Sequence, residues 1–380
     1  MILTSLAAIS LLIWIYLLLA RGSFWRIKSN LISPAATAAP ANIVAVIPAR
    51  DEAENIGHAV ESLLTQSLPI RVIVVDDASS DGTAEIARAA AARVNAVDRF
   101  QVLTGKPLQS GWTGKLWAVS QGLDRALEQN PDYVLLTDAD ILHGPNSLRD
   151  LVPIARSRDY GLTSLMVKLA CDSFAEKALI PAFVFFFLQL YPPAWIHDPQ
   201  SKTAGAAGGC MLVRPSALAR IGGISAIRNE VIDDCALARA IKRSGDKIWM
   251  GLTSETLSIR PYRTFSEIGR MISRSAFNQL RHSTLLLIAT IAGLLITYIV
   301  PPLALLSGNT KTVLLGAAAW LLMTILYLPI VRFYGRSWLW ALTLPAVALF
   351  YIGATIHSAV RYWTGRGGAW KGRVQDLRGE

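Results

Sequence analysis

Four long segments without charged side chains constrain this 380-residue chain more than any other feature. Residues 1–20, 283–310 and 312–331 contain no Asp, Glu, Lys or Arg, and residues 337–360 contain His357 as their only basic or acidic side chain. Each segment can cross a hydrocarbon layer of roughly 30 Å, and helices buried in soluble cores seldom run so far without a charge. The sequence therefore predicts an integral membrane protein.

The charges that follow the first apolar segment predict its orientation. Residues 1–20 contain no basic n-region, their apolar run is long, and "LLLARGS" is a poor cleavage site, which favours an uncleaved anchor over a signal peptide. Arg21, Arg26 and Lys28 come directly afterwards, so the positive-inside rule predicts that the next domain faces the cytoplasm at the inner membrane. The net charge of +10 suits an anionic membrane surface and phosphate-bearing ligands. We expect no nucleic-acid partner, because no basic run is interleaved with aromatic residues.

The number of C-terminal spans is open at two or three. Three spans would place the tail outside, whereas the five Lys and Arg residues of 361–380, against two acids, favour the inside. Pro301 and Pro302 could turn the first span into a re-entrant hairpin. The expected organisation is an anchor (1–20), a basic juxtamembrane stretch and linker (21–41), a catalytic domain (42–282), a transmembrane region (283–360) and a basic tail (361–380).

Between these segments, short β-branched runs alternate with helical patterns. The runs "IVAVI" (43–47), "RVIVV" (71–75), "RFQVL" (99–103) and "YVLL" (133–136) are each separated by a helical stretch. This alternation predicts an α/β fold with a mixed, mostly parallel sheet flanked by helices. Ligands of such sheets bind beyond the carboxyl ends of the strands, and acidic clusters follow three of these runs: "PARDE", "DDASSDGT" and "DAD". We expect these clusters to form one site.

Asp138 and Asp140 raise the question of how two like charges one residue apart are compensated. Hard carboxylate oxygens at this spacing suit Mg²⁺ or Mn²⁺, which takes its other ligands from water and substrate phosphates. A D-x-D motif is weak alone and gains weight from the neighbouring acidic clusters. The expectation is that a metal carrying a nucleotide diphosphate compensates the pair.

The other motifs allow both a functional and a purely structural interpretation. Asp81 is expected to cap the helix near Thr83, whereas Asp76 and Asp77 are free to hold a base or ribose. Lys115 in "GWTGK" marks either a phosphate site or a plain helix start. "GAAGGCMLVR" (205–214) would let a ligand approach the backbone. The pair Asp233 and Asp234 begins a helix, where acids also complement the helix dipole.

In this order, "VIPARDEAENI", "VIVVDDASSDGT", "GWTGK", "TDAD", "GGCML" and "DDCALARAI" resemble family 2 of the inverting glycosyltransferases, which have the GT-A fold. The resemblance covers about 42–282 and is greatest to the hopene-associated membrane glycosyltransferases, with ceramide glucosyltransferases more distant. It implies a UDP-sugar donor and a divalent metal, whereas transfer of a single sugar is favoured by a departure from the family pattern. The residues it implies are Pro48, Arg50 and Glu52 along the nucleotide, Asp76 and Asp77 at uracil or ribose, Asp138 and Asp140 at the metal, and Asp234 as general base.

Two departures from the family pattern bear on the chemistry. The usual Glu-Asp pair is Asp233-Asp234 here, so either carboxylate could be the base. The (Q/R)-x-x-R-W signature is replaced by "NQLRH" (278–282), which disfavours a processive polymerase. The segment "LIPAFVFFFLQLYPPAWI" (179–196) is interpreted either as an interfacial stretch that admits a lipid or as an internal helix. Two rivals remain: a polyprenyl-phosphate sugar transferase, and a non-catalytic scaffold or transporter subunit, disfavoured because the spans carry almost no ionisable residues.

Overall fold

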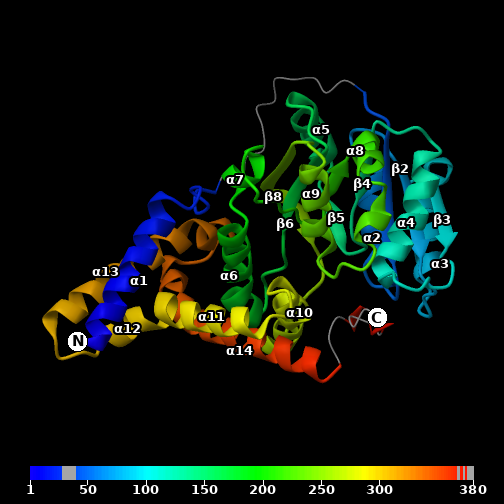
Figure 1. Cartoon of the computed structure of the whole chain (residues 1–380). Coiled ribbons are helices and arrows are strands. Elements are labelled where there is room, and N and C mark those ends of the chain that lie inside the picture. The colour runs from blue at the N-terminus through cyan, green and yellow to red at the C-terminus, as the bar shows by residue number, and fades with distance from the viewer. Residues whose placement is uncertain (28–39, 366–368, 371–372, 375–380) are drawn as a thin grey trace. The chain divides into compact units, whose positions relative to one another are not determined.

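The computed structural model describes residues 1–27, 40–365, 369–370 and 373–374 (Figure 1). The chain forms two compact units, each assembled from segments that are distant in the sequence. Unit 1 comprises Met1–Ile27, Cys171–Ala194 and Pro261–Gly368, and unit 2 comprises Lys28–Ala170, Trp195–Arg260 and Ala369–Glu380. The stretch expected as one catalytic domain, 42–282, is therefore divided, because 171–194 and 261–282 cluster with the long apolar helices.

Unit 2 contains the α/β part of the chain, and helix α7 (Pro193–His197) crosses its boundary with unit 1. Its strands are β1 (Ile43–Ala49), β2 (Arg71–Asp76), β3 (Phe100–Thr104), β4 (Tyr133–Leu136), β5 (Ile141–His143), β6 (Leu162–Lys168), β7 (Met211–Val213), β8 (Ile248–Ser258), β9 (Ala369–Trp370) and β10 (Arg373–Val374). Its helices are α2 (Ile56–Leu64), α3 (Thr83–Arg93), α4 (Gly114–Leu127), α5 (Ser147–Ser157), α8 (Pro215–Arg220), α9 (Asp233–Arg243) and the 3-10 helices η1 (Val97–Arg99) and η2 (Ile224–Ile227).

Eight strands form one mixed sheet in the order β3-β2-β1-β4-β7-β6-β8-β5. The expected strands β1 to β4 are parallel neighbours, as the alternating pattern predicted. The other half contains antiparallel pairs, β4 with β7, β7 with β6 and β8 with β5. The expected mixed, mostly parallel sheet flanked by helices is confirmed.

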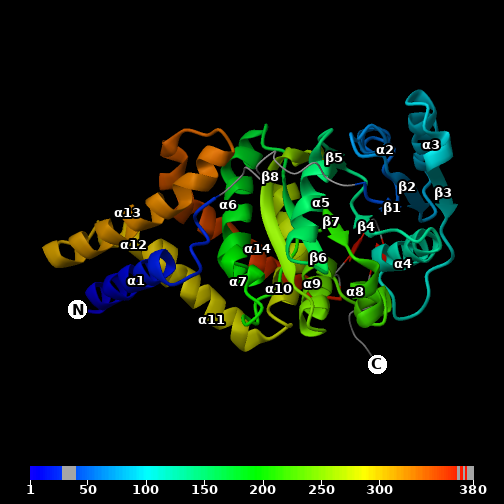
Figure 2. The same ribbon diagram turned by 90° about the horizontal axis from the view of Figure 1, so that it is seen from above.

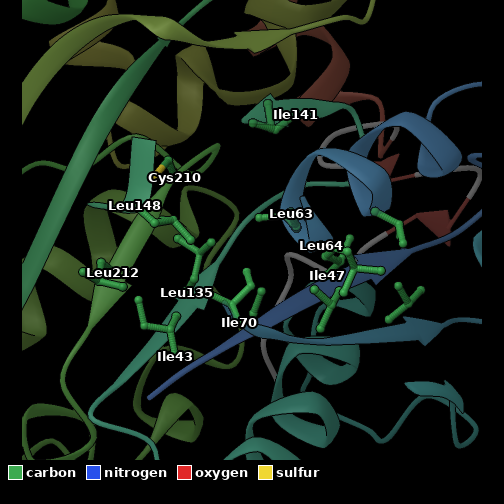
Figure 3. Close-up of a cluster of buried hydrophobic side chains, with 14 of the residues drawn as sticks. Ile43, Ile47, Leu63, Leu64, Ile70, Leu135, Ile141, Leu148, Cys210 and Leu212 are labelled. Atoms are coloured by element: carbon green, nitrogen blue, oxygen red, sulfur yellow. The ribbon is translucent and has the colours of Figure 1, made fainter. Parts of the chain in front are cut away.

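The two faces of the parallel half are covered by different helices. Ile43, Ala45 and Ile47 of β1 point into a buried cluster with Leu63 of α2 and Leu148 of α5 (Figure 3). Helices α2 and α3 lie on one side of β1 to β3, and α4 lies on the other (Figure 2). Successive strand residues therefore alternate between two apolar layers, which fixes the register of the strands and thus the position of their carboxyl ends.

In the described part of unit 1, all the regular elements are helices. They are α1 (Ile2–Leu19), α6 (Phe174–Leu190), α10 (Phe265–Gln279), α11 (Thr284–Leu294), the π-helical turn η3 (Leu295–Ile299), α12 (Val300–Ala304), α13 (Thr310–Phe333), the 3-10 helix η4 (Trp338–Thr343) and α14 (Leu344–Trp363). Five helical stretches among the described residues are long and apolar enough to cross a membrane: Ile2–Leu19, Phe174–His197, Thr284–Ala304, Thr310–Phe333 and Trp338–Trp363. The segment 179–196, expected to be interfacial or internal, thus belongs to a fifth candidate span.

A backbone hydrogen bond that is missing within the helical stretch 284–304 is replaced by side chains of α1. Pro301 has no backbone N–H, so the carbonyl of Thr297, four residues earlier, lacks its usual helical partner. That carbonyl accepts hydrogen bonds from Trp14 Nε1 at 2.9 Å and from Ser10 Oγ at 3.1 Å. The π-helical turn and Pro301 are therefore accommodated within a continuous helical stretch of 21 residues.

Several sequence expectations lie wholly or partly outside the described residues. Lys28 and most of the linker (33–41) do, as does much of the basic tail (361–380). Arg21 is described, and it donates hydrogen bonds to the carbonyl oxygens of Gln189 and Leu190 at the end of α6. This arginine therefore caps a helix in unit 1, in addition to the orienting role that its charge predicts.

Candidate active site

Most of the expected site residues lie at or just after the carboxyl ends of neighbouring parallel strands of unit 2, and Lys115 and Asp234 lie in the first turns of α4 and α9. In the sheet, Ala49 of β1 lies opposite Asp76 of β2, and Val46 of β1 lies opposite Leu136 of β4. The loops after β1, β2 and β4 therefore start at the same edge, as expected for the three acidic clusters. Their charged side chains form three groups, each containing a cation.

The first group joins the ends of β1 and β2. Arg50 Nη1 donates to the backbone oxygen of Asp77 at 2.5 Å and lies 3.7 Å from Asp77 Oδ2. Asp77 is buried, with 3% of its surface exposed, whereas Asp76 Oδ1 accepts from the backbone N–H of Ser79. Asp81 accepts from the backbone N–H of Thr83 in the first turn of α3, so its expected structural role is confirmed.

The second group is centred on Lys115, in the first turn of α4. Thr113 caps this helix by accepting from the N–H of Leu116, so the helix start is also a conventional one. The Lys115 ammonium lies 2.9 Å from Asp138 Oδ1 and 3.0 Å from Asp233 Oδ2. Burial opposes its charge, but the two carboxylates outweigh burial and raise the pKa of Lys115. This lysine therefore links the D-x-D motif to the Asp233-Asp234 pair.

The third group contains Arg260, just beyond β8. Its Nε donates to Asp140 Oδ2 at 2.8 Å, and its Nη2 binds both carboxylate oxygens of Glu52, with 2.7 Å to Oε2. Despite burial, these two acids raise the pKa of Arg260. The backbone N–H of Ile259 donates to the backbone oxygen of Asp140 at 2.9 Å, which holds Arg260 beside the motif. Side-chain cations thus compensate both aspartates of the D-x-D motif within the protein itself.

Asp234 is held by backbone amides. Its Oδ1 accepts from the N–H of Cys235 at 2.7 Å, and its Oδ2 accepts from the N–H of Gly208 at 3.0 Å. Burial, followed by the charge of Asp233, raises the pKa of Asp234 to about 6 although Lys115 and these amides oppose the shift. A carboxylate with a pKa in this range is suited to accept a proton near neutral pH.

The glycine loop before β7 is tied to the end of β4. Thr137 Oγ1 donates to the backbone oxygen of Gly209 at 2.7 Å, so its hydroxyl oxygen is left to accept from His143 Nε2 at 3.0 Å. Burial lowers the pKa of His143 to about 3, which keeps this imidazole neutral. At Gly208, a Cβ atom would lie 3.5 Å from Asp234 Oδ2 and 3.7 Å from Lys115 Nζ, so this backbone lies directly against the charged groups.

A narrow cleft opens beside the second group. Its polar lining includes Lys115, Asp138 and Asp233, and Gly208 and Pro48 also line it. The remaining wall is aliphatic, from β4, α4, α9 and neighbouring segments. Pro48, predicted to line the nucleotide, is therefore brought together with the D-x-D motif.

The donor set of the D-x-D motif suits a hard divalent cation. Asp138 gives one oxygen to Lys115 and Asp140 gives one to Arg260, and the second oxygen of each makes no hydrogen bond within the described part of the chain. Four carboxylates, Glu52, Asp138, Asp140 and Asp233, share the two cations Lys115 and Arg260. The described residues contain no group of three or more His, Cys, Asp and Glu side chains arranged to hold a metal. Two carboxylates would therefore need further ligands from a substrate or water.

Three contributors to this site were missed from the sequence: Arg260, His143 and the amide of Gly208. Arg260 follows β8, which belongs to the half of the sheet that the pattern did not predict. Its partners Glu52 and Asp140 are 208 and 120 residues away in the chain. The only available signal was a charged residue directly after an apolar strand, which is common at any sheet edge.

Comparisons with known proteins find similar sequences and a similar fold. Residues 44–222 match the family described as Glycosyl transferase family 2. A 4,4'-diaponeurosporenoate glycosyltransferase of Staphylococcus aureus (strain bovine RF122 / ET3-1) is 38% identical over 100 residues, which are 26% of this chain and 24% of that protein. The enzyme of the same name from strain USA300 is 40% identical over 96 residues, 25% of this chain and 23% of its own length. The chain thus spans about a quarter of these relatives.

One solved structure supports the fold over nearly the whole chain. It is the mannosyltransferase PcManGT of Pyrobaculum calidifontis in complex with GDP-Man and Mn²⁺, with a TM-score of 0.59 and 18% identity. The similarity covers 94% of this chain and 98% of that one. The chain therefore has the GT-A fold, and its residues 44–222 are similar to the glycosyl transferase family 2 domain.

Proposed function

We propose that this protein is a membrane-bound inverting glycosyltransferase that transfers one sugar from a UDP-sugar to a lipid hydroxyl, with a hopanoid-type lipid as one candidate. The observation that carries this proposal is Lys115, whose ammonium contacts the D-x-D aspartate Asp138 and the acid pair through Asp233. A donor diphosphate and an acceptor hydroxyl would thus be bound within a few ångströms of each other, as an in-line displacement requires.

In this mechanism, Asp234 is the general base. Its carboxylate takes the proton of the acceptor hydroxyl while that oxygen forms a bond to the anomeric carbon of the sugar. The bond from this carbon to the diphosphate breaks, and the nucleotide diphosphate leaves with the electron pair. The amides of Gly208 and Cys235 orient the carboxylate, and its raised pKa suits proton transfer near neutral pH.

We assign the donor site to the residues along the same sheet edge. Asp76 and Asp77 would bind the uracil or ribose, and Pro48, Arg50, Glu52 and Lys115 would line the nucleotide. Asp138 and Asp140 would hold Mg²⁺ or Mn²⁺ through the oxygens that Lys115 and Arg260 leave unused. When bound, the metal would offset the negative charge of the departing diphosphate.

The five apolar helical stretches support a membrane location and a lipid acceptor. The name of the Staphylococcus aureus relatives gives a second candidate acceptor, 4,4'-diaponeurosporenoate, which would take the sugar on a carboxylate and so would not need Asp234 as a base. The charges after α1 support a cytoplasmic catalytic unit, where nucleotide sugars would be available.

The test is release of UDP by the purified full-length protein with a panel of UDP-sugars, in the presence and absence of EDTA. We expect release that requires a lipid acceptor and stops when EDTA is added. Hopanoid alcohols, 4,4'-diaponeurosporenoate and polyprenyl phosphate would be offered separately, and an acid-labile product would indicate the polyprenyl-phosphate alternative. GDP-sugars would be tested in parallel. Turnover of GDP-sugars and of no UDP-sugar would contradict the donor assignment, and nucleotide release that EDTA does not affect would contradict the role of the metal.

A further inference from the structure

Arg260 has no role in the donor site as assigned above, yet its guanidinium makes three hydrogen bonds to carboxylate oxygens beside the D-x-D motif. One guanidinium binds Asp140 and both oxygens of Glu52. The side chains of Glu52, Asp140 and Arg260 are only 9%, 13% and 29% exposed. Two carboxylates with so little access to water repel each other strongly unless a cation lies between them.

We propose that Arg260 is an internal counter-ion that prevents Glu52 and Asp140 from capturing a metal ion before the donor binds. The inference rests on the proposed metal site, but it concerns binding and can be tested without turnover. Without the guanidinium, Glu52 and Asp140 would lose the cation that they share, and their hard carboxylate oxygens are of the kind that Mn²⁺ and Mg²⁺ prefer as ligands. With Arg260 in place, Asp140 has a single oxygen to offer.

The proposed role depends on the positive charge of Arg260 and on the position in which its backbone is held. The hydrogen bond from Ile259 N–H to the backbone oxygen of Asp140 fixes the backbone next to the motif, so the guanidinium is held close to its partners. Because Lys115 pairs with Asp138 as Arg260 pairs with Asp140, each aspartate of the motif has only one oxygen left to offer a free metal ion. The nucleotide diphosphate adds negative charge and ligand oxygens, so metal and donor should bind together.

The experiment measures binding of Mn²⁺ alone to the full-length protein in detergent, from the electron paramagnetic resonance signal of the free ion. We expect weak binding to the wild type. Arg260→Met removes one positive charge next to the ligands and should raise the affinity for Mn²⁺ alone by about tenfold or more. Arg260→Lys keeps the charge and should stay near the wild-type value. A gain in Arg260→Lys as large as in Arg260→Met would overturn the proposal, as would no gain in Arg260→Met.

Two further variants separate the counter-ion role from general effects of the substitution. Arg214 is a matched control, since it binds the buried Asp246 and also Asp159 outside the site, and Arg214→Met should leave Mn²⁺ binding unchanged. The double variant Arg260→Met/Glu52→Gln should lose most of the gain, because it removes one of the uncovered ligands. If Arg260→Met does not fold, Arg260→Gln must show the gain instead.

Addition of UDP distinguishes failure of this inference from failure of the proposed function. Under the proposed function, UDP raises the Mn²⁺ affinity of the wild type. If UDP has no such effect while Arg260→Met binds Mn²⁺ alone more tightly, the counter-ion role stands and the donor assignment fails. If UDP raises the wild-type affinity and neither neutral variant gains affinity for Mn²⁺ alone, the counter-ion role is wrong and the donor assignment stands.

Discussion

Asp233 and Asp234 are adjacent in the sequence and have opposite environments in the structure. The Asp233 carboxylate is paired with a lysine, whereas the Asp234 carboxylate accepts hydrogen bonds from two backbone amides and has no side-chain cation within ion-pair distance among the described residues. A base paired with an ammonium is a poor proton acceptor, so the difference favours Asp234 over its neighbour. The sequence alone left this choice open.

The first prediction concerns these two acids. Asp234→Asn should lower turnover by about 10²- to 10⁴-fold while donor and metal binding persist, because amide and carboxylate are similar in size. In the wild type, turnover should rise with pH through about 6, as Asp234 loses its proton, and then level off. Asp233→Asn removes a neighbouring negative charge that helps raise this pKa, so its acid limb should move to lower pH. Separate measurements of donor affinity and of the pH–rate profile test this. An inactive Asp233→Asn enzyme with an active Asp234→Asn enzyme would move the base to Asp233.

The second prediction concerns the metal ligands. Asp140→Ala should abolish transfer and remove the dependence of UDP-sugar binding on Mg²⁺ or Mn²⁺, because one of two hard ligands is lost. Asp138→Ala should be nearly as severe. Calorimetry of donor binding with and without metal provides the measurement, and Asp159→Ala serves as the control because the exposed Asp159 pairs with Arg214 outside the site. Retention of metal-dependent turnover in both site variants would show that the motif does not bind metal.

At the scale of elements, the close contact of α4 with the sheet determines where Lys115 lies. A Cβ atom on Gly122 would lie 2.4 Å from Val46 Cγ1 and 2.9 Å from Val75 Cγ2, so only glycine allows this approach. Because Lys115 is about two turns earlier on the same helix, this packing also determines how far its ammonium reaches over the strand ends. The close packing at Gly122 in the core of unit 2 therefore helps to determine the position of Lys115 in the site.

The third prediction follows from this contact. Gly122→Ala should lower the free energy of unfolding by about 1–3 kcal/mol, because overpacking against two core valines outweighs the better helix propensity of alanine. Gly353→Ala is the matched control, since Gly353 is also helical and a Cβ there would meet nothing within 4 Å. Thermal unfolding of both variants in detergent would compare them. A midpoint that falls no further for Gly122→Ala than for Gly353→Ala would contradict the packing argument.

The first four strands were predictable because each is a β-branched run that ends in turn residues and is followed by a helical pattern. The second half of the sheet gave weaker signals: β5 and β7 have three residues each, and β8 has an irregular alternation of buried and exposed positions. The aspartates of the site were found from their positions after the predicted strands. Arg260 was not, because only the antiparallel pairing of β8 with β5 brings it to Asp140.

At the scale of the whole molecule, the fourth prediction is the topology. All three native cysteines are buried, so a single introduced cysteine should be the reactive one. Glu85, with a side chain 75% exposed on α3, is a suitable site. Glu85→Cys should react with a membrane-impermeant maleimide only after cell lysis, because Arg21, Arg26 and Lys28 favour a cytoplasmic unit 2. Labelling in intact cells would overturn this orientation.

The same assay addresses the number of C-terminal spans. Gly308, between α12 and α13, lies in open space, since a Cβ atom added there would meet nothing within 4 Å. If 284–304 crosses the membrane completely, Gly308→Cys should be labelled in intact cells, whereas a re-entrant hairpin would keep it protected. The structure contains three apolar helical stretches in this region, each long enough to span, so we expect labelling.

The bonds from α1 to the Thr297 carbonyl have a consequence for biosynthesis. The indole of Trp14 and the hydroxyl of Ser10 are made first, and their acceptor is made 283 and 287 residues later. During translation, α1 must therefore wait for most of the chain before these two donors reach their native partner. A ribosome-stalled chain that ends before Thr297 should hold α1 without this contact, and its docking should be among the last steps of assembly.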